Sequence, residues 1–132
     1  MWKSLTLSLK KRDKLMHMKK FQIKNINDVP FEKIHEVSNS RKTLASKADL
    51  VTDNIDALTK GFLQPGQKWD WHKHELYDEL GIVINGKGKF FWEDELVDYK
   101  PEDVIIIPAN SKHKFEATGD TTSEFYFVRI KI

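Results

Sequence analysis

Hydrophobic and polar residues alternate in short runs along most of this chain, a pattern typical of strands. From residue 58 onward, turn-forming segments such as 64–67 (Gln-Pro-Gly-Gln) separate the runs. We expect strands at residues 42–46, 58–63, 68–74, 80–84, 89–92, 96–99, 104–107, 113–117 and 124–132. Short strands at intervals of about ten residues predict an all-β sandwich or barrel.

Three local signals add detail to this pattern. Ser46 and Asp49 have the spacing of a capping box, and apolar residues follow at roughly helical spacing to residue 58, so we expect a short helix there. Asn85 and Gly86 have the chemistry of a tight hairpin turn. His35 lies in a polar stretch, and we interpret it as an ordinary surface histidine.

Composition favours a single soluble globular domain. The chain has 132 residues, of which 39% are apolar and 32% charged. It contains no cysteine, which excludes disulfides, thiolate metal sites and a cysteine nucleophile. The apolar runs are too short to span a membrane, and the N-terminus has no secretory signal pattern. We therefore expect a cytoplasmic protein.

Charge is distributed unevenly between the first twenty residues and the rest. Residues 1–20 carry seven lysines or arginines and one acid, whereas residues 21–132 have a net charge of −4. We interpret residues 1–20 as a basic N-terminal extension, either disordered or adding an edge strand through the alternation of residues 2–9. Residues 21–132 would form the single β-barrel domain.

Candidate chemistry is concentrated in residues 66–86. His72 and His74 are two residues apart, so on a strand both side chains point to the same face. Glu79 follows five residues later, next to another predicted strand. Two imidazoles and a carboxylate that converge in this way are suitable ligands for a divalent metal ion.

These residues resemble the first motif of the cupins, G-x5-H-x-H-x3,4-E-x6-G. Gly66, His72, His74, Glu79 and Gly86 occupy every fixed position. The second motif, G-x5-P-x-G-x2-H-x3-N, is matched only in part. Its proline and histidine are present as Pro108 and His113, while Glu102, Asn110 and Ala117 replace its glycines and asparagine.

The resemblance implies a double-stranded β-helix, that is, a jelly-roll barrel. It also implies a single divalent transition metal inside the barrel, held by four ligands: His72, His74, Glu79 and His113. Imidazole and carboxylate ligands suit Fe, Mn, Ni, Zn or Cu, and the ligand set does not choose among them. Cupins also commonly form dimers through sheet edges, so we expect a homodimer.

Strand parity predicts the lining of the pocket around this centre. Asp70 shares a face with His72 and His74, while Trp69 and Trp71 lie on the opposite face, provided that no bulge resets the register. Four residues are candidates for contact with a substrate by the same parity or by charge: Asp70, Asn85, Phe115 and Arg129. An inward-facing Arg129 would bind a carboxylate.

The function expected from these residues is that of a metal-dependent enzyme. An ion with four protein ligands keeps open positions for a small oxygen-bearing substrate, and acts as a Lewis acid or an oxygen-activating centre. Dioxygenase-like chemistry comes first, and a sugar or uronate isomerase or lyase is the alternative. A non-catalytic ligand-binding or sensor protein is the third interpretation. The expected partner is a small molecule, and neither a membrane nor nucleic acid.

Overall fold

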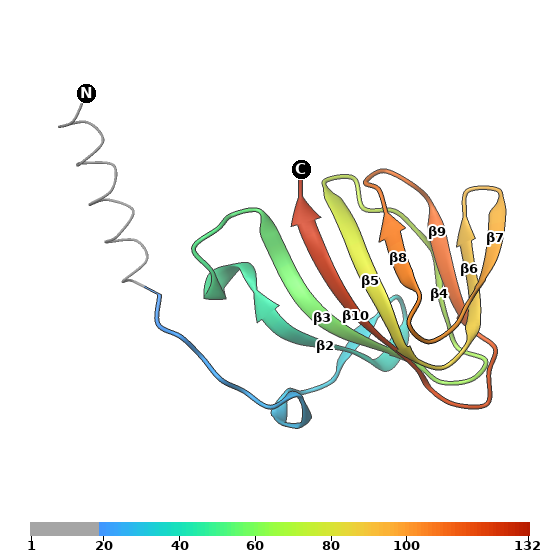
Figure 1. Cartoon of the computed structure of the whole chain (residues 1–132), viewed down its shortest axis with the longest axis horizontal. Coiled ribbons are helices and arrows are strands. Elements are labelled where there is room, and N and C mark those ends of the chain that lie inside the picture. The colour runs from blue at the N-terminus through green and yellow to red at the C-terminus, as the bar shows by residue number, and fades with distance from the viewer. Residues whose placement is uncertain (1–18) are drawn as a thin grey trace.

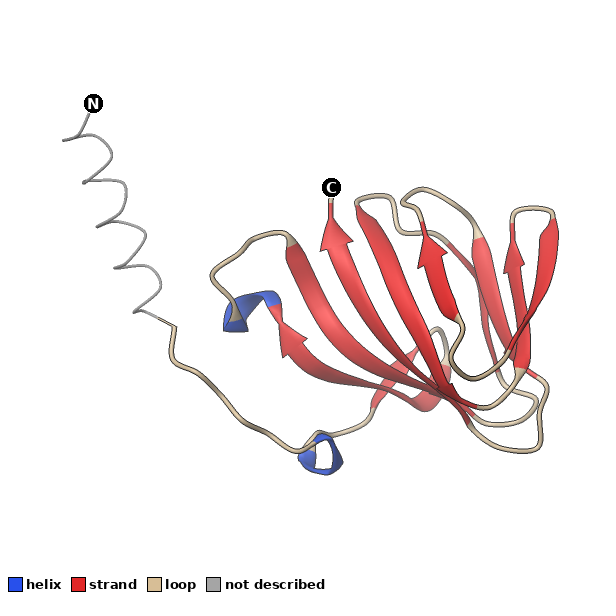
Figure 2. Cartoon of the chain, viewed as in Figure 1, coloured by secondary structure: helices blue, strands red, loops and turns tan. Residues whose placement is uncertain are grey.

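The computed structural model describes residues 19–132, which fold almost entirely into strands (Figure 2). The predictions for residues 1–18, including the edge strand over residues 2–9, lie outside the described residues. Two single-turn 3₁₀ helices, η1 (Ile26–Asp28) and η2 (Lys47–Asp49), are the helical elements of the described chain. Neither is long or apolar enough to span a membrane.

Ten strands of the described chain form two antiparallel sheets. In spatial order, the larger sheet contains β1 (Glu32–Ile34), β2 (Val37–Ser46), β3 (Ile55–Leu63), β10 (Ser123–Lys131), β5 (Tyr77–Asn85) and β8 (Val104–Ile107). The smaller sheet contains β4 (Lys68–His72), β9 (His113–Ala117), β6 (Gly88–Trp92) and β7 (Glu95–Tyr99). Figure 1 shows the larger sheet curving beside the smaller one. This is the predicted jelly-roll architecture.

An aromatic core fills the space between the sheets. Trp69, Phe115, Phe125 and Phe127 are all buried, with ring centroids 5.3 to 6.0 Å apart in successive contacts. Two glycines make room for these rings. A Cβ at Gly61 would lie 2.5 Å from Trp69, and one at Gly81 would lie 2.6 Å from Phe127. Larger residues at these two positions would displace the rings that form the floor of the cavity described below.

The predicted helix after residue 46 is wrong beyond its first turn. The capping box forms, because the amide of Ser46 donates to Oδ2 of Asp49 at 2.8 Å, but only η2 follows it. The chain then enters β3 at Ile55, which pairs with both β2 and β10. Pairing on two sides satisfies the backbone along this stretch and buries Ala57 and Thr59, which outweighs a weak helical spacing.

The predicted hairpin at Asn85 and Gly86 is also wrong. The two strands that flank these residues, β5 and β6, belong to different sheets, so the connection crosses between the sheets. Gly86 adopts a φ of +85°, and a Cβ there would lie 2.5 Å from the Cα of Ser123. Glycine is therefore needed here because the backbones at Gly86 and Ser123 approach each other closely.

Candidate metal centre

Three histidines converge at one end of the barrel. His72 is the last residue of β4, His74 lies in the loop that follows, and His113 begins β9 directly opposite His72. Each offers one ring nitrogen, and these three atoms lie within 4.8 Å of one another. The antiparallel pairing of β4 with β9 thus brings together residues that are about forty positions apart in the sequence.

Backbone carbonyls orient two of the three rings. Nδ1 of His72 lies 2.6 Å from the carbonyl oxygen of Asp70, and Nδ1 of His113 lies 3.0 Å from that of Ser111. A carbonyl only accepts, so Nδ1 carries the proton in both rings and the lone pair lies on Nε2. Nε2 of His113 is buried and has no hydrogen-bond partner among the described residues. A metal ion is the partner that suits this unsatisfied lone pair.

Glu79, the predicted fourth ligand, lies beside the three histidines but outside the group whose ligand atoms are all within 4.8 Å of one another. It lies on β5 with only 9% of its surface exposed, and its Oε2 is 3.9 Å from Nε2 of His74. Burial raises the pKa of its carboxyl to about 7, although the charges of Arg129 and Arg41 act in the opposite direction. A buried carboxylate is costly without a cation, so its position fits a bound metal.

Desolvation also acts on the imidazoles. It is the main cause that lowers the pKa of His74 and that of His113 to about 4, and neighbouring His72 adds to the effect in both cases. The pKa of His72 is lowered too, again mainly by burial. The rings are therefore neutral at pH 7, which is the form that binds a metal ion.

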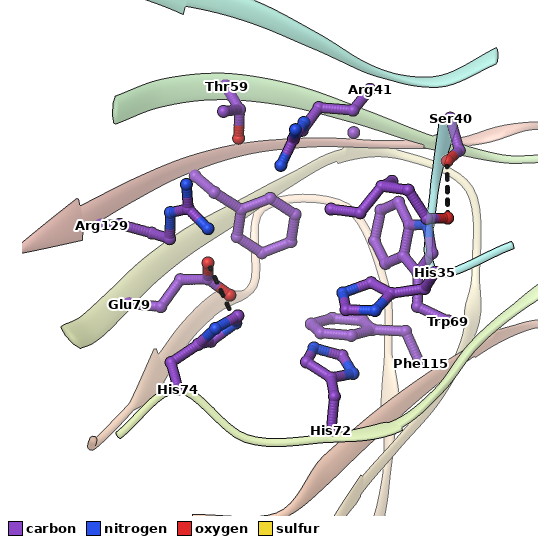
Figure 3. Close-up of a pocket in the computed structure, with 13 residues that line it drawn as sticks. His35, Ser40, Arg41, Thr59, Trp69, His72, His74, Glu79, Phe115 and Arg129 are labelled. Carbon is purple, nitrogen blue, oxygen red and sulfur yellow. Dashed lines mark hydrogen bonds and ion pairs between the residues drawn. The ribbon is translucent and has the colours of Figure 1, made fainter. Parts of the chain in front are cut away.

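A small cavity of about 40 Å³ adjoins the cluster and has room for a few water molecules (Figure 3). Phe115 and Arg129, both named from the sequence as substrate contacts, line it. Phe115 is fully buried in the floor. Arg129 on β10 lies directly opposite Glu79 on β5, and its side chain forms an ion pair with Asp56 at 2.7 Å.

Asp70 does not line the cavity, and Trp69 does, which reverses the parity inferred from the sequence. Trp69 pairs with Phe115, and His72 pairs with His113. Between these two pairs β4 advances by three residues while β9 advances by two, so β4 contains a bulge. This bulge turns Trp69 to the same side as His72. The Asp70 side chain stays 62% exposed, and its Oδ1 accepts from the amide of Trp71.

Asn85 shares the inward face of β5 with Glu79 but lies at the far end of the strand. The two residues are six positions apart, which corresponds to about 20 Å along a strand. The Asn85 side chain donates to the carbonyl of Thr122 at 3.2 Å and lines a different surface pocket beside Gly86. The structure therefore does not bring Asn85 to the histidine cluster.

His35 and Arg41 line the cavity, so the interpretation of His35 as an ordinary surface histidine is wrong. His35 occupies the turn between β1 and β2 with a φ of 49°, and its ring stacks on His72 with centroids 3.9 Å apart. Burial is the main cause that lowers the pKa of His35 to about 4. The available signal was weak: Ile34 and Val37 flank two polar residues, as in a two-residue hairpin, but neither turn residue is glycine or asparagine.

Comparison with known proteins identifies similar sequences. The chain is 33% identical over 66 residues to a 5-nitrosalicylic acid 1,2-dioxygenase of Bradyrhizobium, covering 50% of this chain and 31% of that protein. It is 35% identical over 68 residues to an oxalate-binding protein of Thermotoga maritima, covering 52% of this chain and 56% of that one. The matches thus span about a third to a half of these relatives.

Solved structures share the fold over a larger part of the chain. A predicted oxalate decarboxylase from Thermotoga maritima has a TM-score of 0.75 and 26% identity, covering 84% of this chain and all of that one. A polyketide cyclase from Streptomyces resistomycificus has a TM-score of 0.70 and 20% identity, covering 84% of this chain and 80% of that one.

The sequence model of the Cupin domain family matches residues 62–129, from the last two residues of β3 to the second half of β10. This segment is slightly more than half of the chain and includes all three histidines and Glu79. The match agrees with the jelly-roll fold and with the convergence of the histidines. The chain therefore belongs to the cupin family.

Proposed function

We propose that this protein is a metal-dependent enzyme that acts on a small oxygen-bearing substrate. His72, His74, His113 and Glu79 would together hold one divalent transition metal: Fe, Mn, Ni, Zn or Cu. The observation that carries the proposal is the convergence of three neutral imidazoles, one with a buried and unpartnered Nε2, beside a buried carboxyl. When bound, such an ion supplies Lewis acidity or a centre for dioxygen activation.

The residues around the cluster suit this role. Trp69, Phe115 and Phe127 line the cavity with aromatic surface, which lowers the local dielectric and strengthens electrostatic interactions inside. Arg129 presents a cation to the same space. Dioxygenase-like chemistry is the reaction class that we place first, supported by the similarity to a protein named as a dioxygenase.

A second candidate is a non-catalytic protein that binds a small ligand. The small volume of the cavity and the similarity to an oxalate-binding protein favour this alternative. The same four ligands would hold the metal in both cases. The two candidates differ in turnover, because a binding protein retains the ligand unchanged while an enzyme consumes it.

Metal content and turnover of the His74→Ala variant test the proposal. The variant should bind substantially less metal per chain than the wild type, by elemental analysis after loading and desalting. Its consumption of dioxygen with oxalate or a substituted salicylate should fall in parallel. Lys73→Ala is the matched control, since Lys73 is exposed and its ion-pair partner is the exposed Glu75. An unchanged metal content in His74→Ala would reject His74 as a ligand, and metal binding without turnover would favour the binding protein.

A further inference from the structure

One wall of the cavity comes from a hairpin that precedes the family-matched segment. Strand β1 ends at Ile34 and strand β2 begins at Val37. The two turn residues between them, His35 and Glu36, have positive φ angles of 49° and 67°. This geometry matches the tight turns that favour a right-handed hairpin twist. Ile34, His35, Ser40 and Arg41 from this hairpin all line the cavity. The hairpin is therefore part of the site, although the family match begins only at residue 62.

Two arginines approach the cavity from different strands. Arg41 lies on β2 and Arg129 on β10, and each side chain is 25% exposed. Figure 3 shows the two arginine side chains extending toward each other, with Arg129 next to Glu79 and Arg41 near Thr59. Both positive charges act on the pKa of Glu79 and on that of His35. The electrostatic influence of Arg41 and Arg129 therefore reaches both sides of the cavity.

Each guanidinium is held by one acidic side chain and retains further N–H donors for a ligand. Nε and Nη2 of Arg41 donate to a single oxygen of Glu32, at 3.1 and 2.8 Å. Nη2 of Arg129 lies 2.7 Å from Asp56, while its buried Nε has no hydrogen-bond partner within residues 19–132. A guanidinium has five N–H groups, so both retain donors beyond these contacts. The anchoring acids fix the orientation of each guanidinium and do not line the cavity.

The charges around the cavity do not balance once a metal ion is present. Among the described residues that line it, Arg41 and Arg129 are cations and Glu79 is the acid. Glu32 and Asp56, which pair with the arginines from outside the lining, bring the net charge of these groups to about −1 before a metal binds and to about +1 afterwards. Neutral imidazoles contribute no charge, and a divalent metal adds two positive charges. A low-dielectric site with this excess of positive charge favours an anionic ligand.

The size of the cavity and the shape of the donors select the kind of anion. A carboxylate is planar and matches the fork of a guanidinium in a bidentate contact, whereas phosphate and sulfate are bulkier tetrahedra. The cavity of about 40 Å³ suits the smaller group. We propose that Arg41 and Arg129 form a carboxylate-binding subsite on the wall of the cavity, and that the β1–β2 hairpin selects the substrate by supplying Arg41.

This inference deepens the proposed function, and its substrate is a small carboxylic acid that reaches both the metal and the arginines. Calorimetric titration with oxalate, the smallest dicarboxylate, tests it on protein loaded with metal and on protein freed of metal by a chelator. Arg41→Gln should raise the Kd for oxalate roughly ten- to a hundredfold, the typical loss for a charge-assisted contact. Arg41→Lys, which keeps the charge but loses the fork, should lie between Arg41→Gln and the wild type.

Two control variants separate recognition from structure. Lys33→Gln removes a positive charge from an exposed position of the same hairpin and should leave the Kd unchanged. Glu32→Gln removes the anchor of Arg41 and leaves its charge in place, so it should weaken oxalate binding less than Arg41→Gln does. If Glu32→Gln weakens binding as much as Arg41→Gln, the pair only stabilises the hairpin and the subsite is overturned.

Metal content measured on the same samples distinguishes the two proposals. Normal metal content with wild-type oxalate affinity in Arg41→Gln would overturn the subsite and leave the metal centre intact. A wild-type protein that holds no metal, but whose oxalate binding still depends on Arg41, would reject the metal centre and support the subsite. Circular dichroism confirms folding, and if Arg41→Gln does not fold, the Kd of Arg41→Lys decides: a wild-type value overturns the subsite.

Discussion

At the scale of single residues, the site depends on how each imidazole is oriented. Carbonyl oxygens fix the tautomers of His72 and His113, and the ring of His35 covers one face of His72. Contacts of this kind, one layer outside the ligands, commonly tune metal affinity by holding a ring in the productive orientation. His35 is therefore a positioning residue for His72 in this account.

His35→Ala should lower the metal affinity by a few-fold to about tenfold, because an aromatic stacking contact contributes about 0.5–1.5 kcal/mol. His35→Phe should retain an affinity close to that of the wild type, since phenylalanine preserves the stack without a ring nitrogen. Competition with a chromophoric chelator measures both values. An affinity in His35→Phe as low as in His35→Ala would show that a nitrogen of His35, and not its stacked ring, supports the metal.

The shifted pKa values predict that the metal-free protein loses stability as pH falls from 6.5 to 4.5. His35, His74 and His113 have a pKa of about 4 when folded, against about 6.5 for an unfolded histidine, so the unfolded state takes up more protons across this window. Glu79, whose pKa is raised to about 7, binds its proton more readily in the folded state and so has the opposite effect on stability. It is a single group, whereas three histidines act in the other direction. The urea midpoint should be lower at pH 4.5 than at pH 6.5.

His74→Gln is the control for this pH dependence, because it removes one of the three depressed groups. The difference in urea midpoint between pH 6.5 and pH 4.5 should shrink in this variant. Equal midpoints at the two pH values in the wild type, or an unchanged difference in His74→Gln, would contradict the account of desolvated histidines. A chelator must be present throughout, since a bound metal would hold the imidazoles neutral at both pH values.

At the scale of elements, the strands were predictable and the bulge was not. The expected strands at 104–107 and 113–117 coincide with β8 and β9, because alternation and flanking turn residues mark their ends. The single extra residue in β4 has no such signal, since a bulge depends on how β4 pairs with β9. It moved Trp69 into the cavity and left Asp70 outside.

The candidate centre itself was visible in the sequence because its residues occupy fixed positions of a family motif, although His74 lies in the loop after β4 and not on the predicted strand. His72 and Glu79 occupy motif positions, and His113 was added by a partial second motif. The β1–β2 hairpin was not visible as part of the site. Its contribution through His35 and Arg41 depends on a long-range arrangement in which β2 packs beside β3, and no local pattern encodes that arrangement.

At the scale of the whole molecule, an apolar surface covers one edge of the larger sheet. Five branched aliphatic side chains on β5 and β8 are 41% to 70% exposed: Leu80, Ile82, Ile84, Val104 and Ile106. Leu80 pairs with Ile106 and Ile82 with Val104, and Ile84 follows on the same face of β5. We call these residues the β5–β8 face. A contiguous exposed patch of this kind on an edge strand is typical of a protein interface.

The β5–β8 face supports the prediction of a homodimer, and a charge placed in it should dissociate the dimer. The double variant Ile82→Lys with Ile106→Lys should weaken dimerisation at least tenfold by sedimentation velocity. Val97→Lys is the matched control, because Val97 is 58% exposed on β7 in the other sheet and should leave the dimer unchanged. A monomeric wild type, or a double variant that dimerises normally, would contradict this assignment.

The central claim is that three imidazoles and one carboxylate of a cupin barrel hold a single metal ion. A jelly roll hosts many functions, so the claim depends on the site and not on the fold. X-ray absorption at the metal edge tests it most directly, because imidazole rings give a characteristic outer-shell scattering. The account predicts three imidazoles in the wild type and two in His113→Gln. Spectra without imidazole scattering, or spectra that His113→Gln leaves unchanged, would contradict it.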